Sequence, residues 1–210
     1  MDTFWNQSWE KLNPERMTTY IQTFQITSNP IIDYLHSQKI HTVCDAGCGC
    51  GIYTLLLAAN GFQVSGFDIS PKAVEIARNL LNTASYHAEL KAASVLASGY
   101  PDSTFDCVLS RDVLDHMQKS DARAAVIELL RITKPGGLFL FTVDSVDEEY
   151  ETEPHTVNLD GDYLFNSGKW DGMIFHPYSI QEIPQILPSD IPIHIHQNDD
   201  EMLVLVQKPA

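Results

Sequence analysis

The stretch VCDAGCGCG, residues 43–51, brings together three glycines, three cysteines and one aspartate, Asp45. Cysteine and aspartate side chains can bind metal ions, and glycines let a backbone approach a ligand closely. The cysteines follow a C-x3-C-x-C spacing, with no second Cys/His pair of the kind that zinc sites use. We therefore predict no metal site here, and we expect the cysteines to be small side chains in a buried strand and loop.

The segments on either side of this loop predict how it is held. Residues 41–45 read as a short strand that ends at the glycines, and residues 52–60 read as a buried helix that ends at Gly61. Residues 62–67 predict a second strand, which ends at Asp68. This order of strand, glycine loop, helix, strand and acid indicates parallel strands with the loop at their carboxyl edge.

The alternation of helix and strand continues towards the end of the chain. Ser70 and Ser120 predict helix N-caps, and the second of these helices extends to about residue 132. Further strands are expected at 90–95, 105–110 and 138–143, followed by an antiparallel hairpin at 191–196 and 202–207. We therefore expect an α/β fold with a mostly parallel sheet, helices on both faces and a C-terminal hairpin.

Length and charge limit the possible functions. One domain accounts for residues 1–210, with 1–28 as an N-terminal cover segment and 144–180 as a loop-rich region that forms an acceptor site or lid. The net charge of -15 leaves no basic surface, so we predict neither nucleic acid nor membrane as a partner. Without a signal peptide or an apolar run of membrane-spanning length, we expect a cytoplasmic protein with free thiols.

The glycine loop and Asp68 together indicate an adenosine-containing ligand. Asp68 follows the loop by about 20 residues, a spacing that suits hydrogen bonds to ribose hydroxyls. A dinucleotide favours G-x-G-x-x-G, whereas Gly47, Gly49 and Gly51 form G-x-G-x-G beside Asp45. A carboxylate repels a pyrophosphate but attracts sulfonium and ammonium groups, so the charge pattern favours S-adenosylmethionine over a nicotinamide dinucleotide.

Four segments, in order, carry a resemblance to a known family. VCDAGCGCG is similar to the first motif of the class I S-adenosylmethionine-dependent methyltransferases, and GFDIS (66–70) to their second. STFDCVLSRDVLDHM (103–117) resembles the region of their fourth strand, and LLRITKPGGLFLFT (129–142) the helix, turn and fifth strand that follow. The resemblance implies a Rossmann-like, doubly wound fold and methyl transfer from S-adenosylmethionine.

The resemblance also implies roles for individual residues. On the methionine side of the cofactor it places Asp45, Gly47, Cys48, Gly49, Ser110 and Arg111. On the ribose and adenine side it places Asp68, Ile69, Ser94 and Val95. Ser94 stands where the family often has an acid, and its hydroxyl can still accept the hydrogen bond from the adenine amino group.

Methyl transfer from a sulfonium needs alignment more than acid–base chemistry, so few catalytic side chains are expected. His116, after the fourth strand, is the candidate general base. Candidate residues for binding the acceptor are His176, Tyr178, Trp5 and Trp9. We expect a small-molecule acceptor methylated at oxygen, nitrogen or sulfur. Two alternatives stay open: a nicotinamide oxidoreductase, and a non-catalytic protein or partner subunit that binds S-adenosylmethionine.

Overall fold

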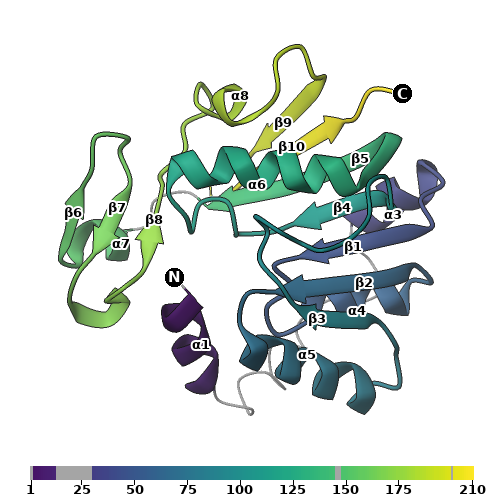
Figure 1. The fold of residues 1–210 in the computed structure, drawn as a ribbon, viewed down its shortest axis with the longest axis horizontal. Helices are drawn as coiled ribbons and strands as arrows, with labels where there is room; N and C mark the ends of the chain where they lie inside the picture. The colour runs from purple at the N-terminus through teal and green to yellow at the C-terminus, as the bar shows by residue number, and fades with distance from the viewer. Residues whose placement is uncertain (1, 13–29, 145–147, 200) are drawn as a thin grey trace.

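The computed structural model describes residues 2–12, 30–144, 148–199 and 201–210 (Figure 1). Most of the predicted cover segment, residues 13–28, lies outside the described residues. The strands of the central sheet are β1 (Thr42–Ala46), β2 (Gln63–Asp68), β3 (Glu89–Ala92), β4 (Phe105–Ser110), β5 (Thr133–Asp144), β9 (Ile193–Gln197) and β10 (Glu201–Gln207). The helices around it are α1 (Asp2–Glu10), α3 (Pro30–Ser37), α4 (Ile52–Ala59), α5 (Pro71–Thr83), α6 (Lys119–Ile132) and α8 (Ile183–Ile186).

The central sheet has seven strands in the order β3-β2-β1-β4-β5-β10-β9. Strands β1 to β5 are parallel, and β10 runs antiparallel to both β5 and β9. Strand β1 is central, because Cys44 pairs with Ser65 of β2 on one side and with Val108 of β4 on the other. The strand order therefore reverses between β1 and β4, where open parallel sheets bind ligands at their carboxyl ends.

Both faces of the sheet are covered, as the sequence predicts. Alternate strand residues point to opposite faces, so Phe139 and Phe141 of β5 pack with α6 and α8, whereas Leu138 and Leu140 pack with α3 and α4. All four side chains are almost fully buried. The apolar character of β5 on both faces is what a central strand of a parallel sheet requires.

The predicted helix signals hold at α4 and α5 but not at α6. Gly61 has a φ of +85° directly after α4, and the Ser70 hydroxyl accepts a hydrogen bond from the Ala73 N–H at 3.2 Å. The predicted cap at Ser120 is wrong, because α6 begins one residue earlier and Gln118 occupies the N-cap position. Ser120 therefore lies inside the first turn of the helix.

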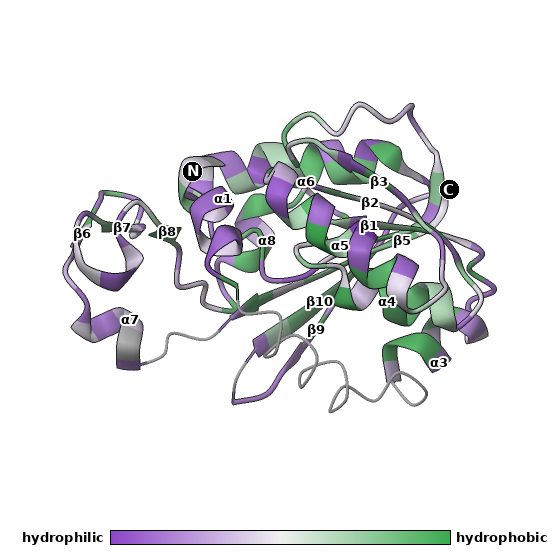
Figure 2. Cartoon of the chain, turned by 90° about the horizontal axis from the view of Figure 1, so that it is seen from below, coloured by the Kyte–Doolittle hydropathy of each residue, from purple (hydrophilic) through white to green (hydrophobic). Residues whose placement is uncertain are grey.

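The segment after β5 is more regular than the sequence indicates. It contains a short helix α7 (Glu148–Thr152), a 3-10 helix η1 (Gly168–Trp170), and a three-stranded antiparallel sheet of β6 (His155–Val157), β7 (Tyr163–Phe165) and β8 (Ile174–Phe175). Loops and turns still separate these short elements, so the region expected to be loop-rich also contains a small sheet that the sequence did not indicate, and its role as an acceptor site or lid stays a prediction. Both views show this small sheet at one end of the molecule, apart from the central sheet (Figures 1 and 2).

The C-terminal hairpin is confirmed, and it completes the central sheet through β9 and β10. Among the described residues, no helix is both long enough and apolar enough to cross a membrane.

Candidate active site

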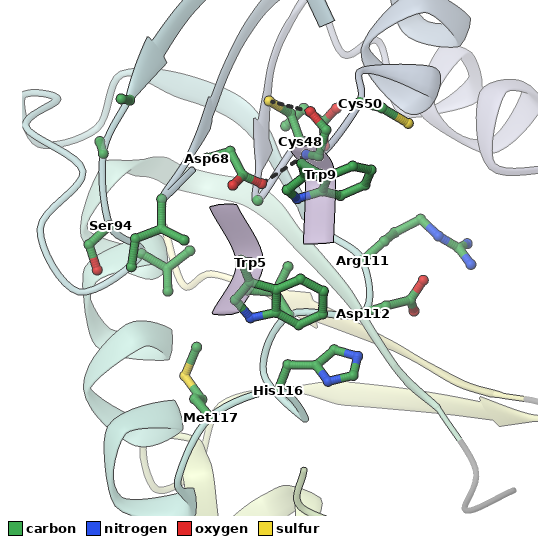
Figure 3. A pocket seen from close by; sticks show the side chains of 18 of the residues that line it. Trp5, Trp9, Cys48, Cys50, Asp68, Ser94, Arg111, Asp112, His116 and Met117 are labelled. Carbon is green, nitrogen blue, oxygen red and sulfur yellow. Dashed lines mark hydrogen bonds between the residues drawn. The ribbon is translucent and has the colours of Figure 1, made fainter. Parts of the chain in front are cut away.

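A cavity of about 990 Å³ opens at the carboxyl ends of β1, β2 and β4, beside the reversal of strand order (Figure 3). Five parts of the chain line it. They contribute Trp5, Trp9 and Leu12; Asp45, Gly47, Cys48, Gly49, Cys50, Ile52 and Tyr53; Asp68 and Ile69; Ala92, Ala93, Ser94, Val95 and Leu96; and Arg111, Asp112, Val113, His116, Met117 and Asp121. The cavity therefore gathers residues that are far apart in the sequence at one edge of the sheet.

The glycine loop needs glycine at each of its three positions. Gly47, Gly49 and Gly51 have φ angles of +79°, +50° and +87°, a region that other residues rarely adopt. Space is also limiting, since an added Cβ at Gly47 would lie 2.4 Å from a Val113 methyl carbon. At Gly49 it would lie 3.0 Å from the Trp9 ring. The loop therefore packs closely against Val113 and Trp9, and it also lines the cavity.

Asp68, at the end of β2, connects the glycine loop to the helix that follows. Its Oδ2 accepts a hydrogen bond from the Gly49 N–H at 2.9 Å, and its Oδ1 accepts one from the Ser70 N–H at 2.8 Å. Burial raises the pKa of this carboxyl, although both backbone hydrogen bonds act in the opposite direction. The carboxylate is held in one orientation at the wall of the cavity, where it can accept hydrogen bonds from a ligand.

Asp45, at the end of β1, is buried and makes one strong hydrogen bond. The Thr54 hydroxyl of α4 donates to its Oδ2 at 2.5 Å. Burial raises the pKa of Asp45 to about 6, and the nearby Asp68 adds to this rise, whereas Thr54 and Arg111 lower it. Near neutral pH the carboxylate therefore places a negative charge beside the glycine loop.

The N-terminal helix α1 closes the cavity on the side opposite the sheet edge. Asn6 fixes it, since its Oδ1 accepts hydrogen bonds from the Ser70 hydroxyl at 2.9 Å and the Lys72 N–H at 3.3 Å. Figure 3 shows the Trp9 indole beside the glycine loop and the Trp5 indole beside His116, whose ring centre is 4.9 Å away. Trp5 and Trp9 thus both line the cavity, and their binding of an acceptor stays a prediction.

Residues 44–141 match the methyltransferase domain family. The segment that carries the glycine loop and the ends of β1, β2 and β4 is thus similar to the class I S-adenosylmethionine-dependent methyltransferases. The four motifs that carry the resemblance thus lie on β1, β2, β4 and β5 of the fold that the resemblance implies.

Several curated methyltransferases are similar to the segment that carries the pocket. A 2-methyl-6-phytyl-1,4-hydroquinone methyltransferase from Synechocystis is 38% identical over 100 residues, which are 47% of this chain and 30% of that protein. A ubiquinone biosynthesis O-methyltransferase from Thiobacillus denitrificans is 37% identical over 102 residues, 48% of this chain and 43% of that protein. The chain thus spans less than half the length of these two relatives.

Solved structures agree on the fold. An S-adenosylmethionine-dependent methyltransferase from Methanosarcina mazei superposes with a TM-score of 0.67 at 20% identity, covering 87% of this chain and 98% of that one. At this identity the likeness concerns the arrangement of the sheet and helices.

The residues expected near the adenine follow β2 and β3 in the chain. Ile69, Ser94 and Val95 all line the cavity. The Ser94 hydroxyl accepts a hydrogen bond from the Leu96 N–H at 3.1 Å, which fixes the turn after β3. The third strand itself ends at Ala92, earlier than the predicted 95, so Ser94 and Val95 are loop residues.

Arg111 and Ser110, which follow one another at the end of β4, differ in their access to the cavity. Arg111 lines it, with its guanidinium paired to Glu201 at 2.5 Å and stacked 4.4 Å from the centre of the Tyr53 ring. Ser110 is fully buried, its hydroxyl has no partner, and it is not among the lining residues. Arg111 therefore reaches the cavity, whereas Ser110 does not.

His176 and Tyr178 do not line this cavity. His176 is buried, with its Nδ1 2.7 Å from Oδ1 of Asp162, and its backbone N–H donates to the Asp115 carbonyl at 2.7 Å. Tyr178 packs into the core beside α6. The two residues thus attach the segment after the small sheet to the core, at some remove from the pocket in which an acceptor site was expected.

The turn after β4 carries acids that the sequence analysis did not single out. Asp112 lines the cavity, and Asp115 is fully buried beneath it. Asp144, at the end of β5, lies close by because β4 and β5 are neighbours, and its N–H donates to Oδ2 of Asp115 at 2.8 Å. Burial raises the pKa of both Asp115 and Asp144 to about 7. The sequence signal for this cluster is that acids occur at or just after the ends of β4 and β5.

His116 lies in this turn, after the fourth strand as expected and three residues before the start of α6. It lines the cavity but is only 8% exposed, and its ring packs against Trp5 and Phe175. Burial lowers the pKa of the imidazole, while Asp144 and Asp112 act in the opposite direction. The ring is therefore neutral near neutral pH, and its Nδ1 has no hydrogen-bond partner.

Proposed function

We propose that this chain transfers the methyl group of S-adenosylmethionine to a small-molecule acceptor in the cavity described above. The observation that carries the proposal is the Asp68 carboxylate, held by the Gly49 and Ser70 N–H groups at the wall of that cavity. A fixed carboxylate at the end of the second strand suits the two hydroxyls of a ribose. The glycine loop beside it leaves room for the rest of the cofactor.

The charges of the cavity support a cationic ligand. Four lining residues are aspartates, namely Asp45, Asp68, Asp112 and Asp121, and one is an arginine. Arg111 is already paired with Glu201, so the acids are not neutralised by it. S-adenosylmethionine carries a sulfonium and an ammonium group and no phosphate. In the same position, the negatively charged pyrophosphate of a dinucleotide would lie beside these carboxylates and be repelled by them.

The residues proposed to hold the cofactor form two groups. Towards its methionine end are Asp45, Gly47, Cys48, Gly49 and Arg111. Towards its ribose and adenine are Asp68, Ile69, Ser94 and Val95. Ser110 is not proposed to contact the cofactor itself, because its side chain is fully buried. It only precedes Arg111, which lines the cavity.

S-adenosylmethionine supplies an activated methyl group, so that the carbon–sulfur bond breaks as a bond to the acceptor oxygen, nitrogen or sulfur forms. The chain then has to align the acceptor with that methyl carbon and exclude water, which is worth roughly 7–11 kcal/mol in well-oriented reactions. Trp5 and Trp9 serve the exclusion of water, since they cover the cavity from α1. His116 is the candidate to take a proton from an acceptor that has to lose one.

The acceptor is proposed to be a small molecule and not a nucleic acid or a membrane lipid surface. The net charge of -15 supports this, because both alternatives need basic surface. The names of two relatives also indicate small-molecule acceptors. One relative methylates a phytyl hydroquinone, and the other acts in ubiquinone biosynthesis. Cys44, Cys48, Cys50 and Cys107 are free, which supports a proposed location in the reducing cytoplasm.

The test is turnover with methyl-labelled S-adenosylmethionine against a panel of phenols, carboxylic acids, amines and thiols. Formation of a labelled product together with S-adenosylhomocysteine supports the proposal and identifies the methylated atom. Tight binding of S-adenosylmethionine without any product across the panel favours the non-catalytic alternative, a cofactor-binding partner subunit. Absence of binding as well as product contradicts both.

A further inference from the structure

Three side chains at the ends of β4 and β5 converge beside the cavity: Asp115, His116 and Asp144. Each offers one ligand atom, and these atoms all lie within 4.8 Å of one another. Asp115 and His116 lie in the turn after β4, Asp144 is the last residue of the neighbouring strand β5, and the hydrogen bond from the Asp144 N–H to Asp115 Oδ2 joins the two. Two carboxylate oxygens and one imidazole nitrogen form a donor set that suits divalent metal ions.

Two of the three side chains have a buried polar atom without a partner. Asp115 is fully buried, and its Oδ2 accepts the hydrogen bond from the Asp144 N–H, which leaves Oδ1 without one. His116 is 92% buried, and its Nδ1 also has no partner among the described residues. Buried polar atoms are nearly always paired, and each exception calls for an explanation such as a bound ion.

The charges around the cluster are also unbalanced. Asp112, Asp144 and Glu201 form a second group of acids that shares Asp144 with the first. Arg111 is paired with Glu201, and the Asp112 carboxylate accepts a hydrogen bond from the Thr142 hydroxyl. These contacts satisfy Glu201 and Asp112, and no cation among the described residues is paired with Asp115 or Asp144. A divalent ion between these two would offset their charge.

We propose that Asp115, His116 and Asp144 bind one divalent metal ion of the Mn²⁺ or Fe²⁺ type at the edge of the cavity. Metal–ligand bonds of roughly 2.1 Å put ligand atoms on an octahedral ion roughly 3 to 4.2 Å apart. The three atoms lie within 4.8 Å of one another, so they would draw closer together when an ion binds between them. This assignment differs from the absence of a metal site predicted at the cysteines, because it rests on residues outside that motif.

The position of the ion defines what it would do. Of the three proposed ligands, His116 lines the cavity, so an ion bound to it would lie at the edge of the space proposed for an acceptor. A divalent ion binds a hydroxyl or carboxylate oxygen and favours its deprotonated form. The site therefore selects an acceptor with such oxygens, and His116 acts as a metal ligand instead of a general base. This consequence rests on the proposed function, whereas the metal site itself does not.

The test uses Mn²⁺ as the probe, with the whole chain and no cofactor added. Electron paramagnetic resonance counts free Mn²⁺ during a titration, and we expect one bound ion per chain. Pulsed measurements on the wild type should show coupling to an imidazole nitrogen, because His116 contributes a ligand. A titration that reaches millimolar Mn²⁺ without stoichiometric binding, or a bound ion without nitrogen coupling, overturns the proposal.

Variants then locate the ion. Asp144→Asn replaces a charged carboxylate with a neutral amide of the same shape, which is a weaker ligand. His116→Phe removes both ring nitrogens, and Phe can keep the ring contacts with Trp5 and Phe175. Both should weaken Mn²⁺ binding at least tenfold, whereas Asp33→Asn, at an exposed position of α3, should not change it. Unchanged binding in both folded variants would contradict the assignment.

A parallel titration with S-adenosylmethionine, followed by Trp fluorescence, separates the two proposals. Cofactor binding without Mn²⁺ binding contradicts the proposed metal site only. Mn²⁺ binding without cofactor binding retains the metal site and sinks the proposed function.

Discussion

The Gly49 N–H donates a hydrogen bond to Oδ2 of Asp68 at 2.9 Å, so the glycine loop after β1 and the acid after β2 form one structural unit. The other carboxylate oxygen holds the Ser70 N–H at 2.8 Å, and Ser70 in turn caps α5 and binds Asn6 of α1. A single side chain thus connects the loop, the second strand, the next helix and the helix that covers the cavity. A ligand that binds Asp68 therefore lies next to the loop, the second strand and both helices.

A pair of glycine substitutions tests how tightly the loop is packed. Gly51 and Gly61 flank α4 with nearly equal φ angles of +87° and +85°, so alanine costs a similar backbone strain at both, about 1–2 kcal/mol. An added Cβ at Gly51 would lie 2.7 Å from the Ala77 Cβ, whereas nothing lies within 4 Å of one at Gly61. Gly51→Ala should therefore lower the free energy of unfolding by a further ~1–3 kcal/mol.

Urea unfolding of the two variants measures this difference directly. Equal losses of stability at both positions would mean that α5 does not press on the loop as the structure indicates.

The pH dependence of cofactor binding tests the role of Asp45. Its pKa is raised to about 6, so its negative charge is lost as pH falls through that value. A cationic ligand should bind more weakly at pH 5 than at pH 7.5, and Asp45→Asn should be weak at both and nearly independent of pH in this range. Calorimetric titrations at several pH values give the profile, and an unchanged profile in the variant would remove Asp45 from the site.

The raised pKa of Asp45 also affects the stability of the fold. Cofactor binding should strengthen as pH rises, whereas the contribution of Asp45 to stability falls. The folded state holds the Asp45 proton more tightly than the unfolded chain does, so this group destabilises the fold progressively as pH rises from about 4 to about 6. Asp45→Asn should therefore show a smaller loss of stability over that interval in urea unfolding. A steeper loss in the variant would contradict the buried, raised-pKa carboxyl.

Tryptophan fluorescence tests whether α1 covers the ligand. The chain has three tryptophans, of which Trp5 and Trp9 line the cavity and Trp170 packs against Tyr150 next to the small sheet. Binding of S-adenosylmethionine should change the emission of the wild type and of Trp170→Phe. The change should shrink in Trp5→Phe and Trp9→Phe. A signal that vanishes only in Trp170→Phe would place the ligand elsewhere.

The part of the fold that holds the cofactor site could be predicted because its signals are local. The glycines, Asp68 and Ser70 each mark the end or start of an element, and the apolar runs between them have the lengths of buried strands and helices. The N-cap of α6 was misplaced because Ser120 is the better cap by residue type, although Gln118 occupies that position. Propensity is a weak guide where packing fixes the helix start.

The remaining features depend on contacts that a linear pattern does not contain. Strands β6, β7 and β8 have three, three and two residues, too few to show an alternation. Asp115 and Asp144 are 29 residues apart and meet only because β4 and β5 are neighbours. His176 was placed near the acceptor because its segment is aromatic, yet its pairing with Asp162 holds it in the interior away from the cavity.

The most direct measurement is a calorimetric titration of the wild type and of Asp68→Asn with S-adenosylmethionine, S-adenosylhomocysteine and NAD. The amide of the variant offers one acceptor oxygen where the carboxylate offers two, and both carboxylate oxygens are in use before a ligand arrives. We expect the wild type to bind the first two ligands and not NAD, and Asp68→Asn to bind them at least tenfold more weakly, with Asp33→Asn as the unaffected control. Binding of NAD alone, or equal affinity of Asp68→Asn and wild type for S-adenosylmethionine, would contradict the assignment of this cavity as the cofactor site.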